Sequence, residues 1–527
     1  MPIQAKHKTG AGSEARLGHD LRGLFEPGVF SDDGSLVSQQ WHPLPDFRPS
    51  VHEEGLNLLQ GRTPFRTGLG SFDPYLGPFV LPAALSHSWA ASFEFLRDLS
   101  PSYGDLVPIL ELWLDQWFIR QNQEPQSSVV RWKAAPNGPS RSDVLIWRGR
   151  RVINWLAHLL PMMQEFSPGL QAKIWHALLA DIARLIEPDR GFLATLTSGW
   201  EPLSRRAVWT RASAILSVWG SAPGLLRHAT FVEALERVEQ LIAPDGMFAD
   251  GSPLGTLSAA ADLAMLTRVV EIEPINQRGR QALITLQRAN GSLVTFNKQR
   301  GYGGLVESVL GPGRWRRSSI LKTGNIGLIE AGSSRLWMRT PVGLSESGPI
   351  CEIEANGCEL VSSGPSGLSA LMFDRSIAMS NPQIRRRDED GRALLESKST
   401  FEVDGHRHSC IRTVTIRQDG KLIQGEDALF SGASGARVQV VGLRFDLGEG
   451  CDPVISRDGE SILIRTPARQ AWRFRCPGFE TQINQASVEL SLGLSQIRRH
   501  QLLCQAKIND TSKDTIVRWD LQLEDLI

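Results

Sequence analysis

The chain has 527 residues, with 57 acidic and 57 basic side chains and no net charge. This length is sufficient for two or three domains with sizeable cores. Balanced charge provides no long-range field toward nucleic acid or an anionic membrane, so neither is an expected partner. No run of about eighteen apolar residues is present, so no membrane span is expected.

The N-terminal stretch is informative about the cellular compartment, and the cysteines are informative about metal binding and disulfides. The N-terminal stretch has no apolar segment of the kind found in secretory signals, so the cytoplasm is the default expectation. All six cysteines lie in the C-terminal part, and none has the spacing of a zinc site. We predict no cofactor, no bound metal and no disulfide between Cys351 and Cys358.

The first half of the chain changes from irregular to helical. Residues 1–75 are rich in Gly, Pro, Ser and charge, which predicts an irregular or disordered arm. Residues 76–288 carry apolar side chains at helical spacing, and helical hairpins in series predict an incomplete α/α toroid or a helical bundle. The predicted helices cover residues 83–96, 105–120, 147–163, 168–185, 205–219, 230–242, 254–270 and 277–287.

The second half has a period of two. Residues 289–317 contain many glycines and are expected to link the helices to a strand-rich domain at 318–527. Turn signals at Asn356-Gly357, Asp419-Gly420 and Asp458-Gly459 separate short alternating segments. Strands in this number predict a large antiparallel β-sandwich.

The hairpin around Asn356-Gly357 is predicted in most detail. Both turn residues suit the positive φ angles of a type I′ turn. Counting outward pairs Ala355 with Cys358, Ile353 with Leu360, and Cys351 with Ser362. Ile353 and Leu360 are then expected to be buried. The opposite face would meet water or a cleft, and it carries Glu352, Glu354 and Glu359.

Several fragments share their order with one known family. Ile350-Cys351-Glu352 with Leu360–Gly364 resembles a strand–turn–strand landmark of the heparinase II/III family, and Gly405–Leu429 resembles another. In the helical half, Ile242–Gly246 and Ser252-Pro253 are similar to the family's Asp-Gly-Gly…Ser-Pro segment. The resemblance implies an α/α toroid followed by an antiparallel β-sandwich, and a location in the periplasm or cell envelope.

The resemblance also implies a chemistry. Active members are polysaccharide lyases that cleave beside a uronic acid by β-elimination. That reaction needs a group that neutralises the uronate, a base for the C5 proton, and an acid for the leaving oxygen. The family's asparagine, tyrosine and histidine would fall near Val208 or Trp209, near Gly255 and near Ser345. These substitutions predict weak or absent lyase turnover with retained binding of an acidic polysaccharide.

Other residues are candidates for the missing roles. Arginine binds carboxylates in a bidentate manner, although a helix face with several arginines can also be merely solvated. The substrate-binding candidates are Arg205, Arg206, Trp209, Arg211 and Asp250. Asp250 beside Gly251 can equally be simple turn chemistry.

Acid–base roles have their own candidates. Tyr302 lies in a glycine-rich segment and can act as an acid or base, or pack as a loop aromatic. His406 and His408 have the spacing that places two side chains on one strand face, which also suits metal binding. The catalytic candidates are therefore Tyr302, His406 and His408.

Three functions remain open from the sequence. The first is a polysaccharide lyase acting on an acidic glycan. The second is a non-catalytic relative that binds polysaccharide in exopolysaccharide production. The third is a glycoside hydrolase on the same architecture, which needs two carboxylates across a cleft; Asp245 and Asp250 are the carboxylates considered for it.

Overall fold

The structure is a computed structural model that describes a defined set of residues. They are residues 41–46, 52–60, 78, 90–99, 103–123, 140–186, 202–294, 296, 303–311, 317–362, 369–403, 406–431, 440–457, 459–489, 496–506 and 514–524. Most of the predicted arm at 1–75 lies outside these residues.

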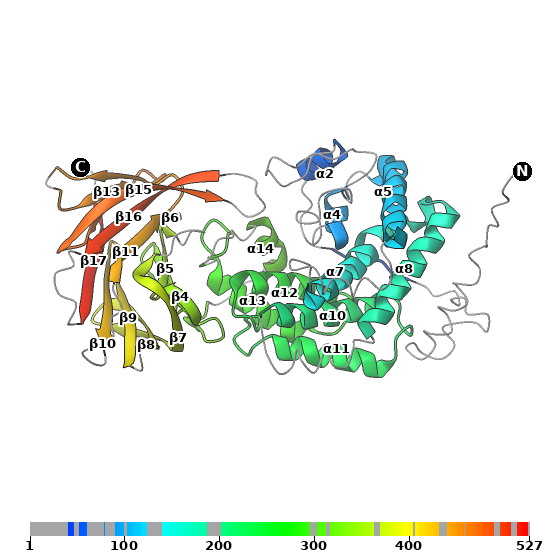
Figure 1. Cartoon of the computed structure of the whole chain (residues 1–527), viewed down its shortest axis with the longest axis horizontal. Coiled ribbons are helices and arrows are strands. Elements are labelled where there is room, and N and C mark those ends of the chain that lie inside the picture. The colour runs from blue at the N-terminus through cyan, green and yellow to red at the C-terminus, as the bar shows by residue number, and fades with distance from the viewer. Residues whose placement is uncertain are drawn as a thin grey trace, which may run out of the picture. The chain divides into compact units, whose positions relative to one another are not determined.

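The described residues form two compact units. One unit contains the residues up to Ala243 together with Ala259–Asn276, and the other contains Pro244–Ser258 and the residues from Gln277 onward. The first unit is helical, and strands make up most of the second, as the change of period predicts (Figure 1). The domain boundaries drawn from the sequence at 76, 289 and 318 stay predictions.

Ten α-helices are present among the described residues. Most coincide with the predicted segments to within a few residues. They are α2 (His52–Leu59), α4 (Leu96–Leu99), α5 (Tyr103–Gln123), α7 (Arg141–Asn154), α8 (Pro168–Ile186), α10 (Pro202–Ser221), α11 (His228–Leu241), α12 (Pro253–Leu266), α13 (Glu273–Leu286) and α14 (Gly303–Leu310). None of these helices is long and apolar enough to cross a membrane.

Two predicted helices differ from the structure. The segment predicted at 147–163 begins earlier, because Ser140 and Asp143 form a capping box that starts α7 at Arg141. A π-helical turn (Trp155–Leu159) and a 3₁₀-helix (Leu160–Glu165) then replace its second half. Within the segment predicted at 83–96, the described residues 92–95 form turns, and Phe93 has a φ of 58°.

Close packing of α7 against α10 organises the helical unit. Gly149 on α7 lies against Thr210 on α10, where a β-carbon would come within 2.8 Å of the threonine side chain. The absence of a side chain at Gly149 therefore allows the two helix backbones to approach closely. This contact positions the candidate residues of α10.

The strands of the second unit form two antiparallel sheets. The first contains β1 (Ile320–Leu321), β2 (Ile326–Ala331), β3 (Ser334–Arg339), β4 (Gly343–Ser347), β5 (Ile350–Ala355), β6 (Cys358–Ser362), β11 (Val440–Leu447), β15 (Phe479–Glu489) and β16 (Gln496–Ala506). The second contains β8 (Arg392–Val403), β9 (His406–Arg417), β10 (Leu422–Ser431), β12 (Asp452–Ile455), β13 (Ile462–Arg465), β14 (Ala471–Arg475) and β17 (Thr515–Glu524).

Strand β7 (Ala370–Glu389) belongs to both sheets. Its first half pairs with β4 and β11, and its second half pairs with β8. Inward side chains of both sheets form one apolar core that includes Ile353, Phe445 and Trp472. The predicted antiparallel β-sandwich is therefore confirmed.

The Asn356-Gly357 hairpin is confirmed with one correction. Both turn residues have positive φ, and Ala355 pairs with Cys358 as predicted. A bulge next shifts the register, so that Ile353 pairs with Val361 and not with Leu360. Ile353 and Leu360 are nonetheless both buried. The bulge breaks the strict alternation on which the predicted register depended.

The exposure predicted for the glutamate face of this hairpin is wrong. Glu352 and Glu354 are 1% and 4% exposed. Glu352 forms an ion pair with Arg288 and accepts a hydrogen bond from the backbone N–H of Phe296. A charged face can be buried when each carboxylate has a basic or N–H partner, which the sequence pattern did not indicate.

Candidate functional site

Helix α10 carries four of the five substrate-binding candidates. Arg206 is exposed and Arg205 is half-buried, whereas Trp209 and Arg211 are each 2% exposed. Only the N-terminal turns of α10 therefore offer guanidinium groups to solvent. The sequence could not distinguish these arginines, because all of them lie within two helical turns.

Trp209 is held inside the helical unit by a buried acid. Its indole Nε1 donates to Asp262 Oδ2 at 2.8 Å, and Arg150 forms an ion pair with the other oxygen of the same carboxylate. This triad joins α7, α10 and α12. Trp209 is one of the two positions, with Val208, near which the resemblance puts the family's asparagine, and its indole nitrogen is bonded to Asp262.

Arg211 connects three helices. Its Nε donates to the backbone carbonyl of Leu185 at 2.7 Å, near the end of α8, and it forms a 3.1 Å ion pair with Glu233 on α11. A guanidinium next to the last carbonyls of a helix satisfies acceptors that have no partner within the helix. Arg211 therefore stabilises the packing of α8 and α11 around α10, and its role in binding substrate stays a prediction.

The loop 244–252 contains the two aspartates considered for a hydrolase. Asp245 accepts hydrogen bonds from the backbone N–H and hydroxyl of Thr323, at 2.8 and 3.1 Å. Asp250 accepts one from the N–H of Ser252 at 2.8 Å and one from its hydroxyl at 3.0 Å. Asp250 thus shapes a local turn, which is the simpler interpretation of an Asp close to Gly, whereas Asp245 joins the loop to Thr323 before β2.

Gly255 lies directly against Asp250. A β-carbon at this position would clash with both carboxylate oxygens of Asp250 and lie 2.7 Å from the hydroxyl of Ser252. The charge of Asp250 acts on Arg339: burial lowers the pKa of that guanidinium, and Asp250 opposes the effect. The position that the resemblance assigns to the family's tyrosine is therefore filled by a carboxylate from the neighbouring turn.

The position assigned to the family's histidine is occupied by Ser345. Its hydroxyl donates to the backbone carbonyl of Ser347 at 3.0 Å on strand β4. The Ser345 hydroxyl cannot act as an acid or base near neutral pH as the imidazole of a histidine does. Gly255 has no side chain that could replace the phenol of a tyrosine in proton transfer. The described part of the chain thus has no usual acid or base at the positions the resemblance indicates.

The two histidine candidates share β9, at unequal depth. His406 is half-exposed, whereas His408 is 3% exposed and stacks on Phe401 with ring centroids 5.1 Å apart. Burial and the neighbouring His406 both lower the pKa of His408. The described residues contain no group of three or more His, Cys, Asp or Glu arranged to hold a metal ion. Tyr302 lies outside the described residues.

Sequence reasoning missed a charged pair in the sandwich core. Arg412 on β9 and Asp427 on β10 form an ion pair in which both side chains are 0% exposed. Trp519 Nε1 also donates to Asp427, at 2.9 Å. Arg412 is in phase with the buried positions Cys410 and Val414, and that phase is the signal that could have revealed it.

The class of protein follows from comparison of this fold with solved structures. Heparinase III superposes with a TM-score of 0.62 at 11% identity, over 97% of this chain and 90% of that one. A mutant of heparan sulfate lyase HepC from Pedobacter heparinus gives 0.55 at 11%, over 92% and 85%. A heparinase III gene product designated BT4657 gives 0.55 at 10%, over 93% and 87%. The chain therefore has the α/α toroid and β-sandwich fold of polysaccharide lyases.

The family resemblance is located in the sandwich. Residues 362–513 match the family model described as Heparinase II/III-like, C-terminal. A comparison with curated proteins finds no match. The resemblance to the heparinase II/III family and the predicted fold class are thus confirmed. Because the sequence identity to the solved structures is only 10–11%, those structural comparisons bear on the fold alone.

Proposed function

We propose that this protein binds an acidic polysaccharide through its uronate carboxylates and catalyses β-elimination slowly or not at all. The proposal depends on one observation: in a chain with the fold of polysaccharide lyases, the carboxylate of Asp250 fills the space next to Gly255. A lyase site needs a proton-transferring group where this chain has a glycine enclosed by a carboxylate. A chain that keeps the lyase fold but lacks the usual residues for proton transfer is expected to bind the polysaccharide rather than cleave it.

The N-terminal turns of α10 supply the proposed carboxylate contact. Arg206 is exposed and Arg205 is half-buried, and both lie at the end of the helix where the dipole is positive. A guanidinium pairs with a uronate through two parallel hydrogen bonds, which favours arginine over lysine in this role. Arg211 is excluded from the proposed contact because Leu185 and Glu233 already occupy its guanidinium.

A true lyase remains the second candidate. Its supporting observation is His406, which is half-exposed on β9, two residues before the buried His408. In that mechanism His406 or Tyr302 would take the C5 proton of a uronate, a C4=C5 double bond would form as the C4–O bond breaks, and the other of these two residues would donate a proton to the leaving oxygen. The product would carry an unsaturated uronate, which absorbs ultraviolet light.

The experiment compares binding with turnover on the same polymers. The full chain is incubated with heparin-like, hyaluronan-like and alginate-like polysaccharides, ultraviolet absorbance is followed, and affinity is measured by calorimetry. We expect binding to at least one polymer, which Arg206→Ala weakens about tenfold, and little or no absorbance change. Glu236→Ala, on the neighbouring helix α11, is the surface control.

Two results would contradict the proposal. Absorbance that grows at ordinary enzyme rates would establish the lyase, and His406→Ala with Tyr302→Phe would then identify its acid and base. Unchanged affinity in Arg206→Ala and Arg205→Ala would show that α10 does not hold the carboxylate.

A further inference from the structure

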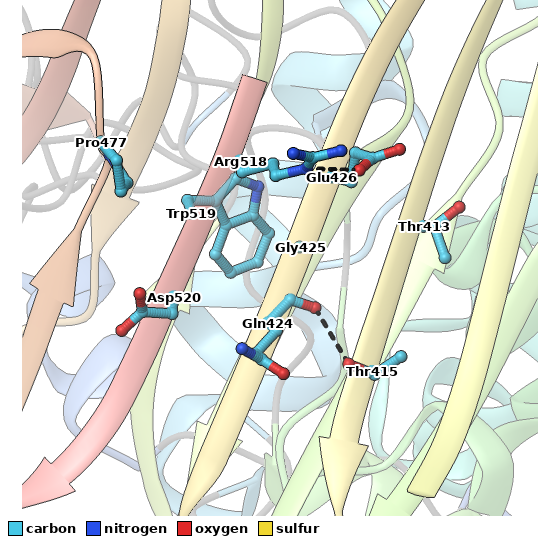
Figure 2. Close-up of a pocket in the computed structure, with 9 residues that line it drawn as sticks. All are labelled: Thr413, Thr415, Gln424, Gly425, Glu426, Pro477, Arg518, Trp519 and Asp520. Atoms are coloured by element: carbon cyan, nitrogen blue, oxygen red, sulfur yellow. Dashed lines mark hydrogen bonds and ion pairs between the residues drawn. The ribbon is translucent and has the colours of Figure 1, made fainter. Parts of the chain in front are cut away.

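An open hollow lies on the outer face of the second sheet (Figure 2). Its volume is about 390 Å³. Residues on β9, β10 and β17 alternate between the core and this face, and the outward ones line the hollow. They are Thr413, Thr415, Gln424, Glu426, Arg518 and Asp520.

Strand register arranges these side chains in two rows. In one row, Thr413 lies opposite Glu426, which lies opposite Arg518. Arg518 Nε donates to Glu426 Oε2 at 2.8 Å, so this row contains a closed ion pair at the surface. The guanidinium is thereby oriented along the sheet, with further N–H groups that can donate to a ligand.

The other row places three polar groups of different kinds side by side. Thr415 lies opposite Gln424, and Gln424 lies opposite Asp520. The hydroxyl of Thr415 reaches the backbone carbonyl of Gln424 at 3.5 Å, and Gln424 itself is one of the residues that line the hollow (Figure 2). This row therefore offers a hydroxyl, an amide and a carboxylate to one ligand.

Asp520 has an unsatisfied acceptor. Its Oδ1 is buried and has no hydrogen-bond partner among the residues that the structure describes. Burial raises the pKa of this carboxyl, and the neighbouring Arg475 on β14 opposes the shift. A buried acceptor without a donor costs free energy, so a rotation of the carboxylate that brings Oδ1 to a ligand O–H in the hollow would remove that cost.

The floor of the hollow excludes stacking on an aromatic ring. Gly425 lies opposite Trp519, and the indole occupies the space that a side chain at Gly425 would need. Trp519 is 2% exposed, and its Nε1 is bonded to Asp427. Stacking on Trp519 is therefore not available. The polar side chains of the strands offer hydrogen bonds that suit a ligand rich in hydroxyl groups, and Pro477 adds an apolar part to the lining.

We propose that this hollow is a binding site for a neutral saccharide unit, separate from the proposed contact for acidic polymers on α10. Sugar hydroxyls would donate to Asp520 Oδ1 and accept from Gln424 and Arg518. Two carboxylates and one already paired guanidinium line the hollow, so a uronate or sulfate would be repelled. The volume lies at the small end of the range of ligand pockets and suits a short segment of sugar rings.

The test uses the full chain and defined neutral probes. Binding of cello-, malto- and manno-oligosaccharides is measured by ligand-observed NMR and calorimetry. We expect at least one series to bind, with affinity lowered about tenfold in Asp520→Asn and in Gln424→Ala. Gln522→Ala is the control, since Gln522 is exposed on the same strand and does not line the hollow.

The remaining outcomes each decide the question. No binding of any neutral series at 10 mM (about the weakest binding such a site would show), or equal affinity in parent and Asp520→Asn, overturns the proposal. Tighter binding of chitosan oligosaccharides than of the neutral series would assign the hollow to a cationic sugar and overturn the neutral assignment. Arg206→Ala is expected to leave neutral binding unchanged, so failure here is distinguishable from failure of the proposed function.

Discussion

Arg412 and Asp427 lie directly opposite each other on β9 and β10 and are joined by two hydrogen bonds inside the sandwich core. The bonds run from Nε to Oδ1 at 2.7 Å and from NH2 to Oδ2 at 3.0 Å. Arg412 also donates to the backbone carbonyl of Ser369, and its guanidinium lies 6.0 Å from the ring centres of Phe445 and Trp519. The pair is therefore fully enclosed and fully bonded.

Breaking this pair should destabilise the strand-rich unit strongly. Asp427→Asn or Arg412→Met leaves a buried charge without its partner, which typically costs about 3–5 kcal/mol. The double variant Arg412→Met/Asp427→Leu should recover much of that loss, because no charge stays buried. Urea denaturation followed by near-ultraviolet circular dichroism measures all three, and a double variant as unstable as the singles would contradict the account.

The hairpin glutamate Glu359 should make stability depend on pH below the ordinary carboxyl range. Burial acts to raise its pKa, but Arg288 and Arg499 overcome that effect and lower the pKa from 4.5 to about 2. A carboxyl whose pKa is lower in the folded state stabilises it above the unfolded pKa, and this contribution is lost as pH falls toward 2.

Glu359→Gln isolates this effect from the other carboxyl groups. The difference in unfolding free energy between parent and variant should be constant above pH 4.5 and shrink steadily between pH 4.5 and 2. A difference that does not change across that window would show that Glu359 titrates normally. Glu396→Gln, a substitution on strand β8 of the other sheet, serves as the control.

Placing a tyrosine at Gly255 should destabilise the protein, because Asp250 already fills the space next to this glycine. Gly255→Tyr would force the carboxylate of Asp250 to move and would disturb its bonds to Ser252. Gly255→Tyr alone is expected to lower the melting temperature, and Asp250→Ala added to it should restore part of that loss. Thermal scans of the single and double variants check the clash, and equal melting temperatures of parent and Gly255→Tyr would refute it.

Ile353 should behave as a core residue. Ile353→Ala is expected to cost roughly 2–4 kcal/mol, because the side chain is 1% exposed and packs within the sandwich core. Ile455→Ala, at a position 50% exposed on β12, should change stability by less than about 0.5 kcal/mol. Similar losses for the two variants in urea denaturation would be inconsistent with the register of the hairpin.

The sequence predicted elements well where one local signal was sufficient. Counting outward from Asp458-Gly459 pairs Ile455 with Ile462 and Val454 with Leu463, and both pairs are observed. In the hairpin at Asn356-Gly357, a bulge between Ile353 and Glu354 shifts the pairing by one residue. Tertiary packing can shift a strand by one residue without changing any local propensity.

Candidate residues were harder to interpret, since partners distant in sequence decide what a charge does. Arg206 and Arg211 lie on the same helix and are each followed by an alanine, yet Arg206 is exposed whereas Arg211 is bonded to Leu185 and Glu233. Asp262, which binds both Arg150 and Trp209, has no local signal at all. Long-range pairing of this kind cannot be deduced from helical period.

Strand β7 pairs in both sheets, so its register determines which of its side chains face the core. Its register shifts between Ser380 and Gln383, where Asn381 has a φ of 48° and donates to the hydroxyl of Thr400. Before this bend the side chains of β7 alternate between core and solvent, whereas beyond it Ile384 packs against the core and residues 385–388 are exposed. Inserting one residue just after Asn381 would turn Ile384 away from the core, whereas inserting two would keep it facing inward. Length changes at this bend should therefore be tolerated only in even steps.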